Sequence, residues 1–223
     1  MAAKHVSEGL MSKILIIGAS SGVGLEAVKA ALARGMAVRA FARSAANIAI
    51  ADPNLERFPG SALNGNDVSA ALAGVDAVIL ALGIPLGAQM LLGPVRLFSE
   101  ATRVLIPAME AAGVKRLVCV TGFGAGDSHS SIGRLQGLGF RLVFGRAYAD
   151  KDIQESLIRQ SRLEWVIARP GILTNGPGTR RYKTLETPGS WKNGVISRTD
   201  VADFLVTALD GNAWVGKTPV LIG

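Results

Sequence analysis

Residues 17–24 read Ile-Gly-Ala-Ser-Ser-Gly-Val-Gly, and this stretch decides the fold of the chain. It directly follows residues 13–17, a β-branched run that is typical of a strand buried on both faces. It also opens residues 25–34, which are expected to form a helix. Glycines between a strand and a helix let backbone N–H groups approach a pyrophosphate, and the helix N-terminus adds partial positive charge. The stretch therefore predicts a phosphate-binding loop after the first strand of an α/β fold.

The three glycines of this loop have different expected tasks. Gly18 allows the tight turn, Gly22 allows the close approach of a phosphate, and Gly24 allows the helix to pack against the sheet. The spacing is G-x-x-x-G-x-G rather than the commoner G-x-G-x-x-G, and glycines also serve ordinary turns. The position after the first strand favours the phosphate loop over a simple turn. Its candidate cofactor-binding residues are Gly18, Ser20, Ser21, Gly22, Val23 and Gly24.

Strand-like and helix-like segments alternate along the rest of the chain. Apolar residues spaced three and four apart predict a helix over residues 95–112, kinked at Pro107 and ended by Gly113. Another helix is expected behind Thr199 as its N-cap, with Asp200 in the first turn. The alternation predicts a single-domain α/β fold, a Rossmann-type doubly wound parallel sheet with helices on both faces. The further expected strands are residues 38–42, 77–82, 117–121, 165–168 and 220–222.

Composition excludes several classes of protein. With 49% hydrophobic and 18% charged residues among 223, the chain is too apolar to be disordered. A single cysteine, Cys119, excludes an internal disulfide, and two histidines disfavour a zinc centre. The most apolar stretch, residues 77–88, is shorter than the roughly 20 residues that a membrane span needs. Residues 1–11 show no signal-peptide pattern, so we expect a flexible extension, a domain over residues 12–223 and a cytoplasmic location.

The net charge of +7 favours an anionic partner. Nucleic acid is disfavoured, because no run of five like charges occurs and aromatic residues make up only 5% of the chain. A phosphate-rich small molecule suits the charge, and so does a merely basic surface. The sequence is compatible with both a monomer and a homodimer.

The end of the second strand predicts which dinucleotide binds. A carboxylate there, about 20 residues past the loop, would accept the ribose hydroxyls of NAD. Residues 37–44 contain no acid and offer Arg39, Arg43 and Ser44, which suit a 2′-phosphate. The alternative is a pair of solvated arginines. The missing acid favours NADP, with NADPH preferred over NADH.

Further motifs accompany the glycine loop and span nearly the whole chain, at residues 38–43, 76–79, 113–118, 169–171 and 196–202. Together they resemble the atypical branch of the short-chain dehydrogenase/reductase superfamily. This branch contains the NmrA-like and flavin/biliverdin-reductase-like NAD(P)-binding proteins, often labelled NAD-dependent epimerase/dehydratase. The resemblance is specific for the superfamily and not for a substrate.

The resemblance implies positions for the rest of the cofactor. Leu82 and Gly83 would line the path of the adenosine and the nicotinamide ribose, and Thr121 would close the fifth strand. Residues 169–172, which are Arg169, Pro170, Gly171 and Ile172, would approach the nicotinamide carboxamide. Without the resemblance, Pro170 and Gly171 would be interpreted as a plain strand-ending turn.

Two departures from the family pattern affect these implied contacts. Relatives often carry Gly-Asp-Val where residues 60–62 here are Gly-Ser-Ala, so Ser61 is the candidate for the adenine. The family's serine at the end of the fifth strand, whose hydroxyl would bind a substrate carbonyl, falls on Gly122. Thr121 replaces it only if the strand end bends, because neighbouring strand residues face opposite ways.

The candidate proton donor also departs from the pattern. Many superfamily members carry Tyr-x-x-x-Lys, which stacks an ammonium under a phenol on a helix. Here Tyr148 and Lys151 are one residue closer, and Tyr148 is expected near the helix start, so it is either a general acid or a plain aromatic. Lys151 is expected to bind the ribose, with a surface ion pair to Glu155 as the alternative. The candidate catalytic residues are Lys151, Tyr148 and Thr121.

The resemblance implies an NADP(H)-dependent oxidoreductase that moves a hydride between nicotinamide and a small quinone-, flavin- or carbonyl-like acceptor. A first alternative is a non-catalytic NAD(P)(H) redox sensor of the NmrA type, which Gly122 and the shortened Tyr/Lys spacing favour. A sugar-nucleotide epimerase or dehydratase is weaker, because only about fifty residues follow Gly171. Residues 172–195, rich in glycine and proline, are expected to form a small substrate lid, mobile over residues 174–191.

Overall fold

Eight strands form the central sheet of the computed structural model, which describes residues 13–84, 95–131 and 134–223. Neighbouring strands are parallel, except that the last edge strand runs antiparallel to its neighbour. In spatial order the strands are β3 (Leu55–Pro59), β2 (Ala37–Ala42), β1 (Lys13–Ile17), β4 (Ala77–Leu80), β5 (Arg116–Val120), β6 (Glu164–Pro170), β10 (Val220–Ile222) and β8 (Lys183–Leu185). The strand order reverses between β1 and β4, which is the switch point where doubly wound folds bind ligands.

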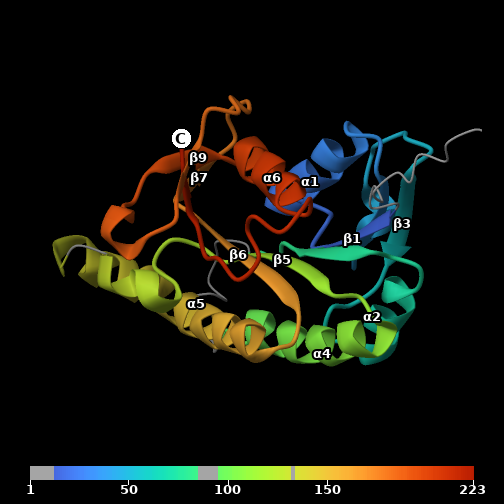
Figure 1. Cartoon of the computed structure of the whole chain (residues 1–223), viewed down its shortest axis with the longest axis horizontal. Helices are drawn as coiled ribbons and strands as arrows, with labels where there is room; N and C mark the ends of the chain where they lie inside the picture. The colour runs from blue at the N-terminus through green and yellow to red at the C-terminus, as the bar shows by residue number, and fades with distance from the viewer. Residues whose placement is uncertain (1–12, 85–94, 132–133) are drawn as a thin grey trace, which may run out of the picture.

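Helices cover both faces of this sheet, as Figure 1 shows. On one face lie α1 (Gly22–Leu32) and α6 (Arg198–Thr207), and on the other lie α2 (Gly65–Leu72), α4 (Leu97–Ala112) and α5 (Arg134–Gln160). Strand β1 explains why both faces are apolar: Ile14 and Ile16 belong to the core under α1 and α6, while Leu15 and Ile17 belong to the opposite core. The doubly wound α/β fold with helices on both faces is confirmed.

The helix ends follow the expected signals with one exception. Helix α4 contains Pro107 and ends at Gly113, whose φ of 72° is left-handed. The prediction that Thr199 caps α6 is wrong. Ser197 has the extended backbone of an N-cap, and its hydroxyl accepts a hydrogen bond from Asp200 N at 2.9 Å. Asp200 does lie in the first turn.

The expected lid region contains more regular structure than its composition predicts. Strand β7 (Ile172–Thr174) pairs with β9 (Val195–Ser197), and β8 pairs with β10. Trp191 packs against Phe123 and the end of β10, and its indole donates to Leu185 O at 3.1 Å. The segment is therefore tied to the sheet, and its mobility stays a prediction. Short 3-10 helices lie at Ala45–Asn47, Gly126–Ser131 and Pro188–Ser190.

The expected N-terminal extension, residues 1–11, lies outside the described residues. Within the described ranges, none of the helices combines the length and the apolar character needed to cross a membrane.

Candidate functional site

The glycine loop lies between the ends of β1 and β4. Gly18 has a φ of +86°, and a Cβ there would lie 2.5 Å from the carbonyl oxygen of Ala81, just after β4. A Cβ on Gly24 would lie 2.1 Å from the carbonyl oxygen of Gly18, so the first turn of α1 packs directly on the loop. Gly18 N donates to Phe41 O at 2.9 Å, which ties the loop to β2 as well. Gly18 makes the tight turn as expected, whereas Gly24 packs against the loop backbone.

The N-terminus of α1 has the features of an anion site. Its N-cap, Ser21, makes no side-chain capping hydrogen bond, and the first turn holds no acidic residue. Asn64, by contrast, caps α2 by accepting from the backbone N–H groups of Asn66 and Asp67. Gly22 has a φ of +58°, and a Cβ there would meet nothing within 4 Å. This open cradle of uncapped N–H groups fits a phosphate, and Ser20 and Val23 flank it in the sequence.

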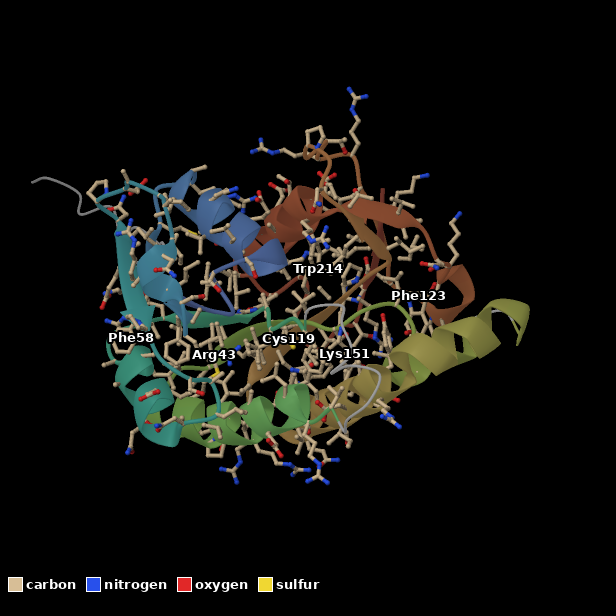
Figure 2. The ribbon with its side chains drawn as sticks, turned by 180° about the vertical axis from the view of Figure 1, so that it is seen from behind. Arg43, Phe58, Cys119, Phe123, Lys151 and Trp214 are labelled. Carbon is tan, nitrogen blue, oxygen red and sulfur yellow. The ribbon has the colours of Figure 1, made fainter. Side chains whose placement is uncertain are left out.

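The two arginines of the second strand have different surroundings. Arg43 and Ser44 lie exposed just after β2. Figure 2 shows Arg43 on the same half of the molecule as Phe58 of β3. Arg39 is buried, and its Nε donates to Glu56 Oε2 at 2.9 Å. Its Nη1 donates to two carbonyl oxygens at the end of α2. The prediction that Arg39 binds a 2′-phosphate is wrong, because β2 and β3 pair in a register that places Glu56 beside it.

The candidate adenine contact, Ser61, takes part in a local turn. Its N–H donates to Asp67 Oδ2 at 2.9 Å, and its hydroxyl accepts from Leu63 N at 3.3 Å. The expected contact of Ser61 with adenine therefore stays a prediction without support from its surroundings. Leu82 and Gly83 follow β4 directly beside the glycine loop, where the path of the ribose was expected.

At the end of β5, the side chain of Thr121 points into the protein. Its Oγ1 donates to Glu155 Oε1 at 2.7 Å, and its carbonyl oxygen accepts from Lys151 Nζ. The Thr121 hydroxyl does not replace the family serine for a substrate carbonyl, because Glu155 binds it in the interior. The expected catalytic role of that hydroxyl is thus wrong, and the backbone carbonyl is the group that reaches Lys151.

Tyr148 occupies the space that the missing serine side chain would fill. A Cβ on Gly122 would lie 2.7 Å from Tyr148 Oη and 3.7 Å from Lys151 Nζ. Tyr148 does not lie near a helix start, as expected from sequence, but well inside α5. The short spacing therefore still brings the phenol, the ammonium and the end of β5 together.

The Lys151 ammonium lies between two aromatic rings. Its Nζ is 5.0 Å from the ring centre of Phe98 and 5.2 Å from that of Tyr148. Desolvation lowers the pKa of Lys151 to about 8 and raises the pKa of Tyr148 to about 12. Figure 2 shows Lys151 and Cys119 close together near the middle of the molecule. The alternative surface ion pair between Lys151 and Glu155 is not formed, because Glu155 is buried and binds Arg169.

Glu155 instead pairs with Arg169, which the resemblance placed near the nicotinamide carboxamide. That prediction is wrong for the Arg169 side chain, because it is buried against Glu155. Arg169 is 0% exposed, and its Nε and Nη2 donate to the two Glu155 carboxylate oxygens at 3.0 and 2.5 Å. Asp127 adds a second carboxylate at 2.5 Å from Nη2, and the guanidinium stacks on Trp191. A lone arginine in the apolar run Trp165–Pro170 needs a buried partner. The apolar run around Arg169 is therefore the sequence signal that could have predicted a buried ion pair.

The segment after Arg169 is not a turn. Strand β6 ends at Pro170, and β7 continues at Ile172 after the single residue Gly171. A Cβ on Gly171 would lie 2.2 Å from Gly194 O, so two backbones meet closely there. Ile172 is 58% exposed at this edge. Pro170, Gly171 and Ile172 therefore leave the sheet in extended conformation. They lie beside the segment after β5, where Phe123 N donates to Pro170 O at 2.8 Å.

Comparison with known proteins agrees with this geometry. A family model described as NAD(P)H-binding matches residues 18–212. ChuY, an anaerobilin reductase from Escherichia coli O157:H7, is 28% identical, with a TM-score of 0.78 and coverage of 94% of this chain and 96% of its own. The uncharacterized sugar epimerase YhfK of Bacillus subtilis is 27% identical over 204 residues, 89% of this chain and 88% of YhfK.

One further solved structure is similar in fold alone. A short-chain dehydrogenase/reductase from Veillonella parvula, in complex with NADP, has a TM-score of 0.79 at 16% identity. The match covers 96% of this chain and 95% of that chain.

Proposed function

We propose a function from one premise: this chain belongs to the NAD(P)H-binding family. It is an NADP(H)-dependent oxidoreductase that acts on a small quinone-, flavin- or carbonyl-like acceptor. The observation that carries the proposal is the uncapped N-terminus of α1 at Gly22, together with an exposed Arg43 just after β2. The similarity to ChuY, a reductase, over nearly the whole chain supports a reductive activity.

The residues divide the work of such a site. The backbone N–H groups of the glycine loop would hold the pyrophosphate, and Arg43 with Ser44 would hold a 2′-phosphate. When bound, the nicotinamide supplies the hydride. Lys151 presents a fixed ammonium at the end of β5, and Pro170 to Ile172 form the neighbouring wall.

The chain offers few side chains that could donate a proton to the acceptor. Gly122 carries no hydroxyl, and the Thr121 hydroxyl is bound to Glu155. We infer that the acceptor draws its proton from water, as a flavin or a quinone does when its reduced form is stable. Tyr148 then shapes the site with a neutral phenol, since its pKa is about 12.

A redox sensor that only binds the dinucleotide is the second candidate, and Gly122 in place of the serine favours it. Turnover separates the two. We expect NADPH oxidation with at least one member of a panel of quinones and free flavins. Tight NADPH binding without turnover on any acceptor would favour the sensor. Both candidates agree with a cytoplasmic protein whose partner is a small molecule.

NADPH is expected to bind about ten- to a hundredfold more tightly than NADH, because a charge-assisted contact contributes about 1.5–3 kcal/mol. Replacing Arg43 with alanine should remove most of this difference while leaving NADH affinity unchanged. Isothermal titration calorimetry measures both. Arg103, exposed on α4, gives a control in Arg103→Ala. Equal affinities of the wild type for the two cofactors would contradict the assignment.

Lys151→Met is expected to weaken NADPH binding, whereas Tyr148→Phe should change turnover by less than about tenfold. If Tyr148 were a general acid, this substitution would lower turnover about 10²- to 10⁴-fold.

The NADPH affinity of the wild type should fall as the pH rises through about 8, since the Lys151 ammonium then loses its proton. Lys151→Met should abolish this pH dependence. A hundredfold loss of turnover in Tyr148→Phe at unchanged NADPH affinity would identify the phenol as the proton donor.

A further inference from the structure

Glu155 contacts the ends of both strands that border the expected nicotinamide position. It accepts from the Thr121 hydroxyl at 2.7 Å, immediately after β5, and from Arg169 at 3.0 and 2.5 Å, near the end of β6. Glu155 is 1% exposed and Arg169 is 0% exposed. One buried carboxylate on α5 therefore holds two neighbouring strand ends in a fixed relation.

The backbone around Gly126 closes over this pair. Gly126 has a φ of +56°, and a Cβ there would lie 2.3 Å from Glu155 Oε2 and 2.5 Å from Arg169 Nη2. The next residue, Asp127, places its own carboxylate on Arg169. Gly126 N donates to Asp152 Oδ1 at 2.6 Å, which fastens the cover to α5. The backbone at Gly126 therefore packs directly on the Glu155 carboxylate, which is 1% exposed, and this burial strengthens the electrostatic effect of the carboxylate on nearby groups.

Thr121 transmits the position of Glu155 to Lys151. The Thr121 side chain is bound to Glu155, and its carbonyl oxygen accepts from Lys151 Nζ. The groups that face this ammonium are Phe98 of α4, Cys119 of β5, and Tyr148 and Glu155 of α5. Cys119 is buried, and burial holds its thiol protonated by raising its pKa. Glu155 is therefore the anion among them.

We propose that Glu155 is a positioning residue, which through Thr121 and Arg169 fixes the ends of β5 and β6 and holds the Lys151 ammonium for dinucleotide binding. The role of Glu155 in dinucleotide binding rests on the proposed function. Its physical content, a coupling between Glu155 and Lys151, is measurable in the free protein. Glu155 contacts no cofactor itself and acts through Thr121.

The first test measures the pKa of the Lys151 ammonium by NMR in the full chain without cofactor. Glu155→Gln removes the charge and keeps the shape, so the Lys151 pKa should fall below its value of about 8. Glu164→Gln is the matched control, because Glu164 pairs with Arg116 near the start of β6. Its Lys151 pKa should equal that of the wild type. An unchanged Lys151 pKa in folded Glu155→Gln would overturn the coupling.

The second test is a double-mutant cycle on NADPH affinity. Glu155→Gln is expected to weaken NADPH binding about tenfold in the wild-type background and less than about twofold in Lys151→Met. A purely structural role would give the same factor in both backgrounds, and that result would overturn the proposal. If Glu155→Gln does not fold, Thr121→Val serves in the same cycle, because it keeps the Glu155–Arg169 pair.

The two tests separate this inference from the proposed function. A wild type that binds NADPH without turnover contradicts the oxidoreductase and leaves the cycle valid. A wild type that binds no dinucleotide contradicts the proposed function, while the NMR measurement still decides whether Glu155 controls Lys151. An additive cycle in an active enzyme contradicts the positioning role alone.

Discussion

Gly22→Val is expected to lower NADPH affinity by at least about a hundredfold, which is beyond the loss from any single side-chain contact in the site. The Cβ of residue 22 would project into the open space in front of the uncapped N-terminus of α1. A valine there takes the volume of the phosphate and blocks its approach to the backbone N–H groups. Calorimetry with NADPH and with NADH measures the loss, which should be equal for both because the pyrophosphate is common to them.

The strain of a valine at positive φ needs a control of its own. Gly74 has a φ of +70° and, like Gly22, an open space around the position of its Cβ. It precedes β4 and lies at the opposite end of that strand from the glycine loop. Gly74→Val should therefore lower the melting temperature about as much as Gly22→Val, with unchanged NADPH affinity. Equal affinities in the two variants would contradict the phosphate-binding role of the loop.

Arg169→Met is expected to lower the free energy of unfolding by about 3–5 kcal/mol, the usual loss when one partner of a buried ion pair is removed. The substitution leaves the Glu155 carboxylate buried without the Arg169 guanidinium. The hydrogen bond that Glu155 accepts from the Thr121 hydroxyl remains. Urea unfolding followed by tryptophan fluorescence measures the change. Arg159→Met is the control, since that arginine is 37% exposed and pairs with the same carboxylates, and its loss should stay below about 1 kcal/mol.

The double variant Arg169→Met with Glu155→Leu tests the cause of this loss. It removes the stranded charge, so it should be more stable than the sum of the single variants predicts. Additive losses would mean that the pair contributes through packing alone.

Asp127 makes the stability of the protein depend on pH. Burial would raise the pKa of Asp127, but the hydrogen bond and charge of Arg169 lower it below the ordinary value. The contribution of Asp127 to the free energy of unfolding is fully present above its ordinary pKa and is lost as the pH falls through the lowered pKa of the folded protein. Arg169→Met should abolish this pH dependence.

The fold and the phosphate loop could be predicted because their signals are local. Continuous apolar runs identify buried parallel strands, and Gly18 and Gly113 stand where the backbone must take a positive φ. The cap of α6 was misplaced by two residues, since Ser197 and Thr199 are both suitable caps and only the end of β9 decides between them.

The side-chain pairs of the site depend on how separate elements dock. Arg39 was expected at the cofactor because it stands in the same short segment as Arg43. Only the register of β2 against β3 shows that Glu56 lies opposite and draws it inward. In the same way, Glu155 is four residues from Lys151 on one helix, yet the docking of α5 against β6 places the Glu155 carboxylate against Arg169. Charge partners across elements follow from tertiary packing, which a single sequence does not contain.

The pairing of β8 with β10 has a consequence for the order in which the chain folds. Strand β10 docks on β6, and β8 docks on β10, although β8 comes earlier in the sequence. Strand β8 therefore has no partner strand until β10 has been added to the sheet, even where β7 and β9 already pair, and its docking carries a loop-closure cost that the early strand pairs do not have. We infer that residues 175–191 join the native structure last, as one cooperative unit with β10 and the Trp191 cluster.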